Sequence, residues 1–199
     1  MSLRMALLAL LTTQPMTGYD LSRQFSSSVG NVWHAADSQI YPELRRMHKE
    51  GLLDAESVPW GSKGATKTQY LITDQGREAV RDWQATVQPY TPDRDPARLK
   101  AAYFEWADSA AVAAQLRAHI QHFETERAHA EQQLEAISSR EQPTIARRLE
   151  HYSADDHERI LAFKLFAYEG KRDQAQHEID WAKRGLKLVD QLGEGRVEV

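Results

Sequence analysis

The sequence predicts a mainly α-helical protein, with one small β-hairpin in its N-terminal part and an entirely helical C-terminal part. Three observations predict this class. Residues 37–50 have the apolar spacing of a short amphipathic helix and lead directly into a hairpin pattern. Prolines at positions 89, 92 and 96 interrupt any helix there. Beyond position 109, apolar residues recur at alternating spacings of four and three, as in a helical seam.

Two helices are expected before residues 37–50. Residues 3–11 are apolar on almost every side, so this helix should be buried. A second helix begins at Thr17 and Gly18. Its apolar positions are Tyr19, Leu21, Phe25 and Val29. Residues 30–34 then form a turn, in which we expect Trp33 to pack rather than to contact a ligand, because buried aromatic rings dominate core packing.

The third helix, residues 37–50, has one apolar stripe and one polar face. Ile40, Leu44 and Met47 recur at i, i+4 and i+7, which predicts that this stripe faces a core. Proline is tolerated only in the first helical turn, so Pro42 predicts a helix start near Ser38, and Gly51 ends the helix. The outer face carries hydroxyl groups and cations. Its residues are Ser38, Pro42, Arg45 and Lys49, flanked by Tyr41 and Arg46.

A β-hairpin is expected directly after this helix. Its arms are residues 52–58 and 67–72, joined by a loop over 59–66 that is rich in turn-forming residues. Thr73 suits the N-cap of a following helix that holds Ala79, Val80 and Trp83. A helix with a cationic outer face followed by a hairpin is what a DNA-binding winged helix needs, since the helix fits the major groove and the hairpin reaches the backbone. Lys63 and Lys67 alone could equally belong to a solvated loop.

Five short motifs in this region occur in the order found in a known family. They are Thr17–Leu21, Gln39–Leu44, Glu50–Leu52, Tyr70–Thr73 and Gly76. Through them the chain resembles the PadR family of bacterial transcriptional regulators, and most closely its longer, AphA-like branch with a helical C-terminal domain. The resemblance implies a winged helix-turn-helix homodimer that binds a pseudo-palindromic operator. In several relatives a small aromatic or cationic effector releases the DNA.

We therefore expect a dimeric, sequence-specific transcriptional regulator, acting as a repressor, and not an enzyme. The residues expected to contact double-stranded DNA are Ser38, Gln39, Tyr41, Pro42, Arg45, Arg46, Lys49, Lys63 and Lys67. The alternative is a winged-helix module that binds a protein partner with the same helix and wing. Salt-dependent binding to duplex DNA separates the two functions.

Composition permits DNA binding without requiring it. The 199-residue chain has a formal net charge of −4, but residues 1–90 hold nine Lys or Arg and nine Asp or Glu, so the acidic excess lies further on. A neutral domain can still bind DNA where its cations share one face. The absence of cysteine fits a reducing cytoplasm. The longest apolar run, residues 5–11, is too short to span a bilayer.

The prolines divide the chain into a DNA-binding domain (1–88), a linker (89–96) and a helical dimerisation domain (97–199). Asp95 and Pro96 suit the N-cap and first position of a new helix. Ser109 opens a long helix whose seam is interrupted by one arginine. The seam residues are Leu116, Ile120, Phe123, Arg127, Ala130, Leu134 and Ile137. Further helices are expected over about 143–169 and 171–192. The seam can form an intramolecular core or a dimer contact.

Two candidate ligand sites lie in the helical domain. Phe104, Trp106 and Trp181 are expected to line an effector pocket where this domain meets the winged domain or its dimer mate, with core packing as the alternative. His122, Glu126 and His129 share one helix face near His119, but a solvated face explains them without a metal. No phosphate loop or nucleophile elbow is present, and no cofactor is expected.

Overall fold

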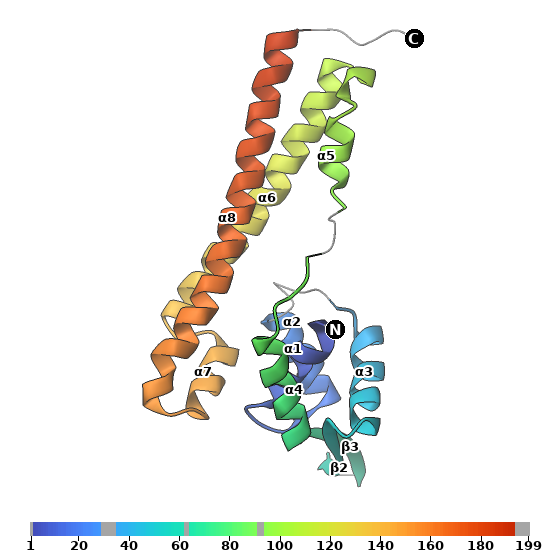
Figure 1. Ribbon diagram of the computed structural model, residues 1–199, viewed down its shortest axis with the longest axis vertical. Coiled ribbons are helices and arrows are strands. Elements are labelled where there is room, and N and C mark those ends of the chain that lie inside the picture. The colour runs from blue at the N-terminus through green and yellow to red at the C-terminus, as the bar shows by residue number, and fades with distance from the viewer. Residues whose placement is uncertain (1, 29–34, 62–63, 91–93, 194–199) are drawn as a thin grey trace. The chain divides into compact units, whose positions relative to one another are not determined.

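The computed structural model of the protein describes residues 2–28, 35–61, 64–90 and 94–193 (Figure 1). These fold into two compact units. The N-terminal unit comprises residues 1–89 and 143–154, and the helical unit comprises residues 90–142 and 155–199. The first division falls at the predicted linker. The assignment of residues 143–154 to the N-terminal unit differs from the single C-terminal domain expected from the sequence.

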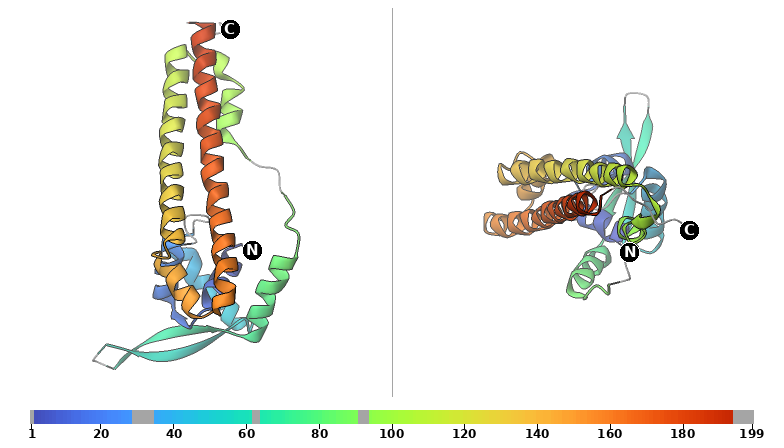
Figure 2. Two further views of the ribbon diagram at one scale, coloured as in Figure 1. Left: turned by 90° about the vertical axis from the view of Figure 1, so that its left-hand side faces the viewer. Right: turned by 90° about the horizontal axis from the view of Figure 1, so that it is seen from above.

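The N-terminal unit is built from short helices around a small sheet. Its elements are α1 (Ser2–Leu11), β1 (Met16–Thr17), α2 (Gly18–Ser27), α3 (Asp37–Lys49), β2 (Leu53–Trp60), β3 (Ala65–Ile72), α4 (Asp74–Ala85) and α7 (Pro143–Glu150). The sheet is antiparallel with the strand order β1-β3-β2. Figure 2 shows the β2–β3 hairpin projecting from the helices of its unit. The predicted fold class, mainly helical with a small hairpin wing, is confirmed.

One hydrophobic core holds this unit together. Its fully buried side chains include Leu7, Leu8, Leu21, Phe25, Ile40, Leu44, Met47 and Leu53, drawn from α1, α2, α3 and β2. The stripe predicted on α3 is therefore its core face, and the first helix is buried as expected. Tyr19, by contrast, is 57% exposed and is not one of the apolar core positions of α2. Val29 and Trp33 lie outside the described residues.

The hairpin is longer than the sequence pattern suggests. Pro59 and Trp60 extend β2, and Ala65 and Thr66 extend β3, so the connection shrinks to residues 61–64. Proline is compatible with β2 because this strand lies at the edge of the sheet, where a missing N–H costs no ladder bond. Gly61 has a φ of 72°, which suits a tight turn.

The helical unit consists mainly of two long helices. Its elements are α5 (Pro96–Ala101), the short 3-10 helix η2 (Phe104–Trp106), α6 (Ser109–Ser138) and α8 (Ala154–Leu192). α6 and α8 run side by side in both Figure 1 and Figure 2. Asp95 caps α5 by accepting a hydrogen bond from the Arg98 N–H at 2.9 Å, and Pro96 is its first residue, as predicted. Among the described residues, no helix has the length and apolar character needed to cross a bilayer.

The predicted seam of α6 is an intramolecular contact along much of its length. Leu116, Ala130 and Ile137 are buried, and the other seam positions are half-buried. Leu116 packs with Ala182 of α8, and the Arg127 guanidinium donates to Gln176 Oε1 of α8 at 2.5 Å. The arginine within the seam thus meets a polar partner on the neighbouring helix.

The last helix begins earlier than expected. The sequence predicts helices over about 143–169 and 171–192. The structure instead interrupts the helix at residues 151–153, and α8 continues through Gly170. Gly170 keeps a negative φ, so it does not form the left-handed cap that ends many helices. A single glycine costs a helix only about 1 kcal/mol, which packing along α8 can offset.

Candidate nucleic-acid interface

α3 presents its polar face away from the core of the N-terminal unit. Ile40, Leu44 and Met47 are fully buried, while Ser38, Pro42, Arg45, Arg46 and Lys49 on the other side of the helix are exposed. Gly51, with a φ of 78°, follows the helix as its left-handed cap residue. The helix therefore shows a hydroxyl-bearing and cationic surface to the solvent.

The start of α3 is fixed by side chains on either side of it. Gln39 Oε1 accepts a hydrogen bond from the Ala36 N–H at 3.2 Å, and the Ser22 hydroxyl donates to the Asp37 carboxylate. These bonds set the helix start at Asp37, so Pro42 is the sixth helical residue and lies in the second turn. The first-turn position predicted for Pro42 is wrong. The Ser38 carbonyl loses its helical donor, but it lies on the exposed face, where water can bond it.

Tyr41 is less exposed than the sequence pattern suggests. Its ring packs against α2 at Gly18, where an added Cβ atom would lie only 2.7 Å from Tyr41 Cε1. Burial raises the pKa of the Tyr41 phenol above its ordinary value, and the neighbouring Asp37 charge raises it further. The phenol therefore remains a hydrogen-bond donor at neutral pH.

The cations of α3 differ in their freedom. Arg46 forms an ion pair with Glu43 at 3.0 Å, and Glu43 also holds Arg4 of α1 at 2.6 Å. Arg45 and Lys49 have no ion pair with any described residue, so their charges are available to an anionic partner. Arg46 is therefore partly neutralised by a carboxylate of its own helix, whereas Arg45 and Lys49 keep their full charge toward the solvent.

Lys67 is the lysine of the wing that lies among the described residues. Its Nζ lies 4.0 Å from the centroid of the Trp60 ring and 5.3 Å from that of the Tyr19 ring. The apolar spacing of α2 predicts a core position for Tyr19, which is wrong, and the loop pattern of residues 59–66 does not single out Trp60. The position of Trp60 among turn-forming residues at the end of a strand could have indicated that it lies at the surface. Lys63 lies outside the described residues.

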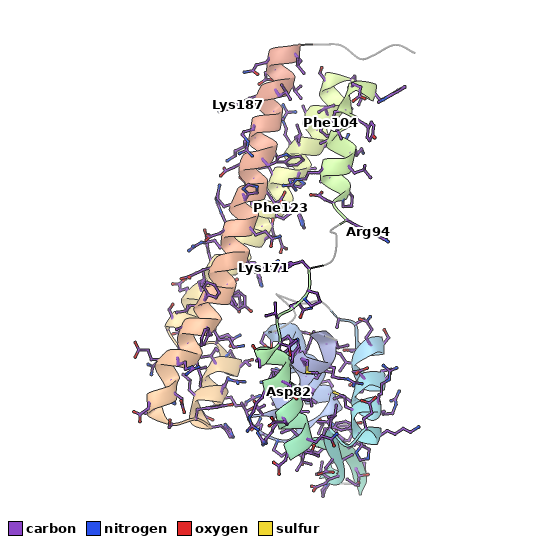
Figure 3. The ribbon with its side chains drawn as sticks, viewed as in Figure 1. Asp82, Arg94, Phe104, Phe123, Lys171 and Lys187 are labelled. Carbon is purple, nitrogen blue, oxygen red and sulfur yellow. The ribbon has the colours of Figure 1, made fainter. Side chains whose placement is uncertain are left out.

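The candidate effector residues separate into two hollows of the helical unit. Phe104 and Trp181 line a pocket of about 630 Å³, together with apolar side chains of α6 and α8 and the charged residues Glu105 and Arg184. Trp106 is 59% exposed and lines a neighbouring hollow of about 410 Å³ instead. Figure 3 draws these side chains and labels Phe104.

The histidines of α6 do not form a metal site within the described part of the chain, where no group of three metal-ligating side chains is found. His119 instead bonds Glu178 of α8 at 3.0 Å and contacts the rings of Phe123 and Trp181. Arg98 of α5 bonds the same carboxylate at 2.5 Å. Burial by itself would raise the pKa of Glu178, but the hydrogen bonds from Arg98 and His119 outweigh it and hold that pKa below its usual range.

The N-terminal unit has the elements of a winged helix-turn-helix domain, followed in the chain by a helical unit. The model of the transcriptional regulator PadR-like family matches residues 7–82. The negative transcriptional regulator PadR of Bacillus subtilis is 34% identical over 102 residues, which are 51% of this chain and 56% of that protein. The match to the PadR-like family thus lies in the N-terminal part of the chain. It spans about half the length of the curated relatives it matches.

Solved structures share the fold across nearly the whole chain. Bacillus subtilis PadR in complex with operator DNA has a TM-score of 0.75 and 22% identity, covering 95% of this chain and 99% of the other. The same protein in complex with p-coumaric acid gives 0.72 at 22% identity, with 96% and 99% covered. The Vibrio cholerae virulence activator AphA gives 0.65 at 22% identity, also with 96% and 99% covered. At these identities the likeness establishes the fold.

Proposed function

We propose that this protein is a homodimeric, sequence-specific DNA-binding repressor of transcription. The carrying observation is that Arg45 and Lys49 stand exposed and unpaired, among the described residues, on the face of α3 opposite its buried stripe. Such a helix can lie in the major groove of duplex DNA. The match to the family model over residues 7–82 and the name of the Bacillus subtilis relative, a negative regulator, support the direction of regulation.

The residues of the interface have different roles in this proposal. Arg45 reads a base edge, and Ser38, with Gln39, Tyr41 and Pro42 beside it, approaches the groove from the helix N-terminus. Arg46 and Lys49, with Lys63 and Lys67 of the wing, bind phosphate groups. The Arg46–Glu43 ion pair makes Arg46 the weakest of these contacts, because Glu43 already offsets its charge.

A homodimer follows from the geometry of DNA-binding proteins that have one recognition helix per chain. One recognition helix per chain covers one half-site, and two half-sites of a pseudo-palindromic operator need a two-fold axis. The helical unit offers the surface for this contact, because α8 exposes large apolar side chains along its length. These are Phe163, Phe166, Leu188 and Leu192.

A small molecule that releases the DNA completes the proposal. The pocket beside Phe104 and Trp181 suits a flat aromatic compound, and Arg184 in its lining would pair with an acidic group on that compound. Trp106 does not line this pocket. Titrating planar phenolic acids should quench the intrinsic fluorescence of the full-length protein, and Trp181→Phe should abolish most of that change, whereas Trp106→Phe should not. Equal quenching in both variants would contradict this pocket.

Duplex DNA binding is the test of the function as a whole. A random duplex library selected on the full-length protein should yield a two-fold-symmetric sequence. Affinity for the selected site should fall by about 10³-fold or more between 50 and 200 mM salt, because several phosphate contacts release counterions. A winged-helix module that binds only proteins would show no enrichment and no salt-dependent DNA affinity, which would favour the alternative function.

A further inference from the structure

A lysine and two exposed aromatic rings meet on the part of the wing nearer its turn. Lys67 Nζ lies within cation–π distance of Trp60, at 4.0 Å from the ring centroid, and near Tyr19, at 5.3 Å. The three side chains come from β3, from β2 and from the first turn of α2. We refer to Tyr19, Trp60 and Lys67 as the wing cluster.

The sheet register explains why these residues meet. Lys67 stands opposite Val58, and Trp60, two residues further along β2, is its diagonal neighbour on the same face. β1 pairs with the other edge of β3, where Thr17 stands opposite Gln69. Thr17 also caps α2, so the pairing of β1 holds the first turn of that helix, and Tyr19 with it, beside Lys67.

The cluster is more exposed than its composition suggests. Trp60 is 55% exposed and Tyr19 is 57% exposed, although aromatic side chains of this size usually bury most of their surface. Lys67 has no ion pair with a carboxylate among the described residues, and its cation is held by rings instead. A cation that is positioned without being neutralised, between two aromatic faces open to solvent, is suited to an anionic partner with apolar surface beside its charge.

We propose that the wing cluster is one DNA-backbone contact, in which Trp60 and Tyr19 act together with Lys67. The Lys67 ammonium binds a phosphate, the open face of Trp60 packs on the deoxyribose beside it, and the Tyr19 hydroxyl donates a hydrogen bond to the next phosphate. Because the rings already restrict the lysine, less side-chain entropy is lost on binding. This inference rests on the proposed function, but it concerns residues of the wing and α2 and not the base-reading face of α3.

Salt titrations of the full-length protein separate the parts of the cluster. The probe is a labelled duplex of mixed sequence and about 30 base pairs, because backbone contacts do not depend on sequence. Lys67→Met should lower the slope of log affinity against log salt by about one, the value for one phosphate contact. Trp60→Ala should weaken binding by about threefold or more at every salt concentration with little change in slope, since it removes no charge. Tyr19→Phe should weaken binding similarly.

Intrinsic fluorescence gives a second readout that does not depend on affinity. Adding the duplex should change the tryptophan emission of the wild type, and Trp60→Phe, which keeps a ring to pack in the hairpin, should remove most of that change. The matched control is Trp83→Phe on α4, which should keep it. Thermal unfolding of each variant checks that the wing still folds.

The results also distinguish this inference from the function on which it rests. If the wild type binds the duplex with a steep salt dependence, while Trp60→Ala, Tyr19→Phe and Lys67→Met bind equally well, the cluster only braces the hairpin and the inference is overturned. If the wild type shows no salt-dependent binding to duplex DNA, the proposed function itself fails.

Discussion

Arg45 and Arg46 are sequence neighbours with different surroundings. Arg46 is paired with Glu43 within α3, and the same carboxylate binds Arg4 of α1, so the charge of Arg46 is already offset. Arg45 points to the same exposed side as Lys49 and has no such partner within the described residues. At the scale of single residues, freedom from internal ion pairs therefore separates Arg45, the candidate base reader, from Arg46, the weaker candidate contact.

Replacement of Arg45 by alanine should test this assignment. If Arg45 reads a guanine, Arg45→Ala should cost about 1–3 kcal/mol of binding free energy at the selected operator and relax specificity at one base pair. Anisotropy titrations against operator variants measure both effects. Arg81→Ala on α4, an exposed arginine paired with Glu78, is the control and should bind as the wild type does. Equal weakening on all sequences would make Arg45 a phosphate clamp instead.

Gly76 illustrates a residue whose small size the fold requires. A Cβ atom there would lie 2.3 Å from the Leu52 carbonyl oxygen and 2.8 Å from Ile72 Cγ1. That oxygen also accepts the Thr73 N–H at 3.2 Å, so the backbone cannot retreat without loosening the start of α4. Gly76→Ala should destabilise the protein by about 1–3 kcal/mol through overpacking.

Gly170 offers the matched comparison, because an added Cβ atom would meet nothing within 4 Å there. Gly170→Ala should stabilise α8 by up to about 1 kcal/mol, through the higher helix propensity of alanine. Thermal unfolding of the two variants and the wild type would measure both effects. A Gly76→Ala variant as stable as the wild type would show that α4 shifts freely relative to β2.

Among the elements of the helical unit, α5 is joined to α6 and α8 through one carboxylate. Glu178 of α8 accepts hydrogen bonds from Arg98 of α5 and His119 of α6, and Arg98 also stacks on the Trp181 ring at 4.3 Å. Trp181 lines the larger pocket. Trp181, which would contact an effector, is thus in contact with Arg98, which joins α5 to α8.

The hydrogen bonds of Glu178 with Arg98 and His119 should make the free energy of unfolding depend on pH. The pKa of Glu178 is lowered in the folded state from 4.5, so its ionised form contributes stability above that pH, and the contribution is lost as pH falls below it. Urea unfolding should show Glu178→Gln less stable than the wild type at pH 7, with the difference narrowing as pH falls below about 4.5. Glu124→Gln, on the exposed side of α6, is the control. A difference independent of pH would mean that Glu178 acts through packing alone.

In the proposed function the protein assembles as a dimer to read a two-fold operator. Phe163 and Phe166 are 64% and 73% exposed on α8, and large apolar side chains at such positions indicate a contact surface. Phe166→Glu should therefore weaken the dimer and reduce operator affinity with it, whereas Phe166→Leu, which keeps an apolar side chain, should remain dimeric. Sedimentation velocity measures the assembly state. A Phe166→Glu variant that is dimeric and binds DNA fully would remove this stretch of α8 from the proposed interface.

The sequence by itself determined the local elements and their capping. The i, i+4, i+7 stripe of α3, the caps at Thr73 and Asp95 and the seam of α6 all depend on neighbours within a few residues, so their patterns could be read directly. Tertiary structure decided the features that depend on distant partners. It extended the hairpin through Pro59, because β2 lies at a sheet edge, and it carried α8 through Gly170, because packing outweighed a weak propensity. It also placed Tyr19 beside Lys67, since the pairing of β1 with β3 joins residues that no local pattern connects.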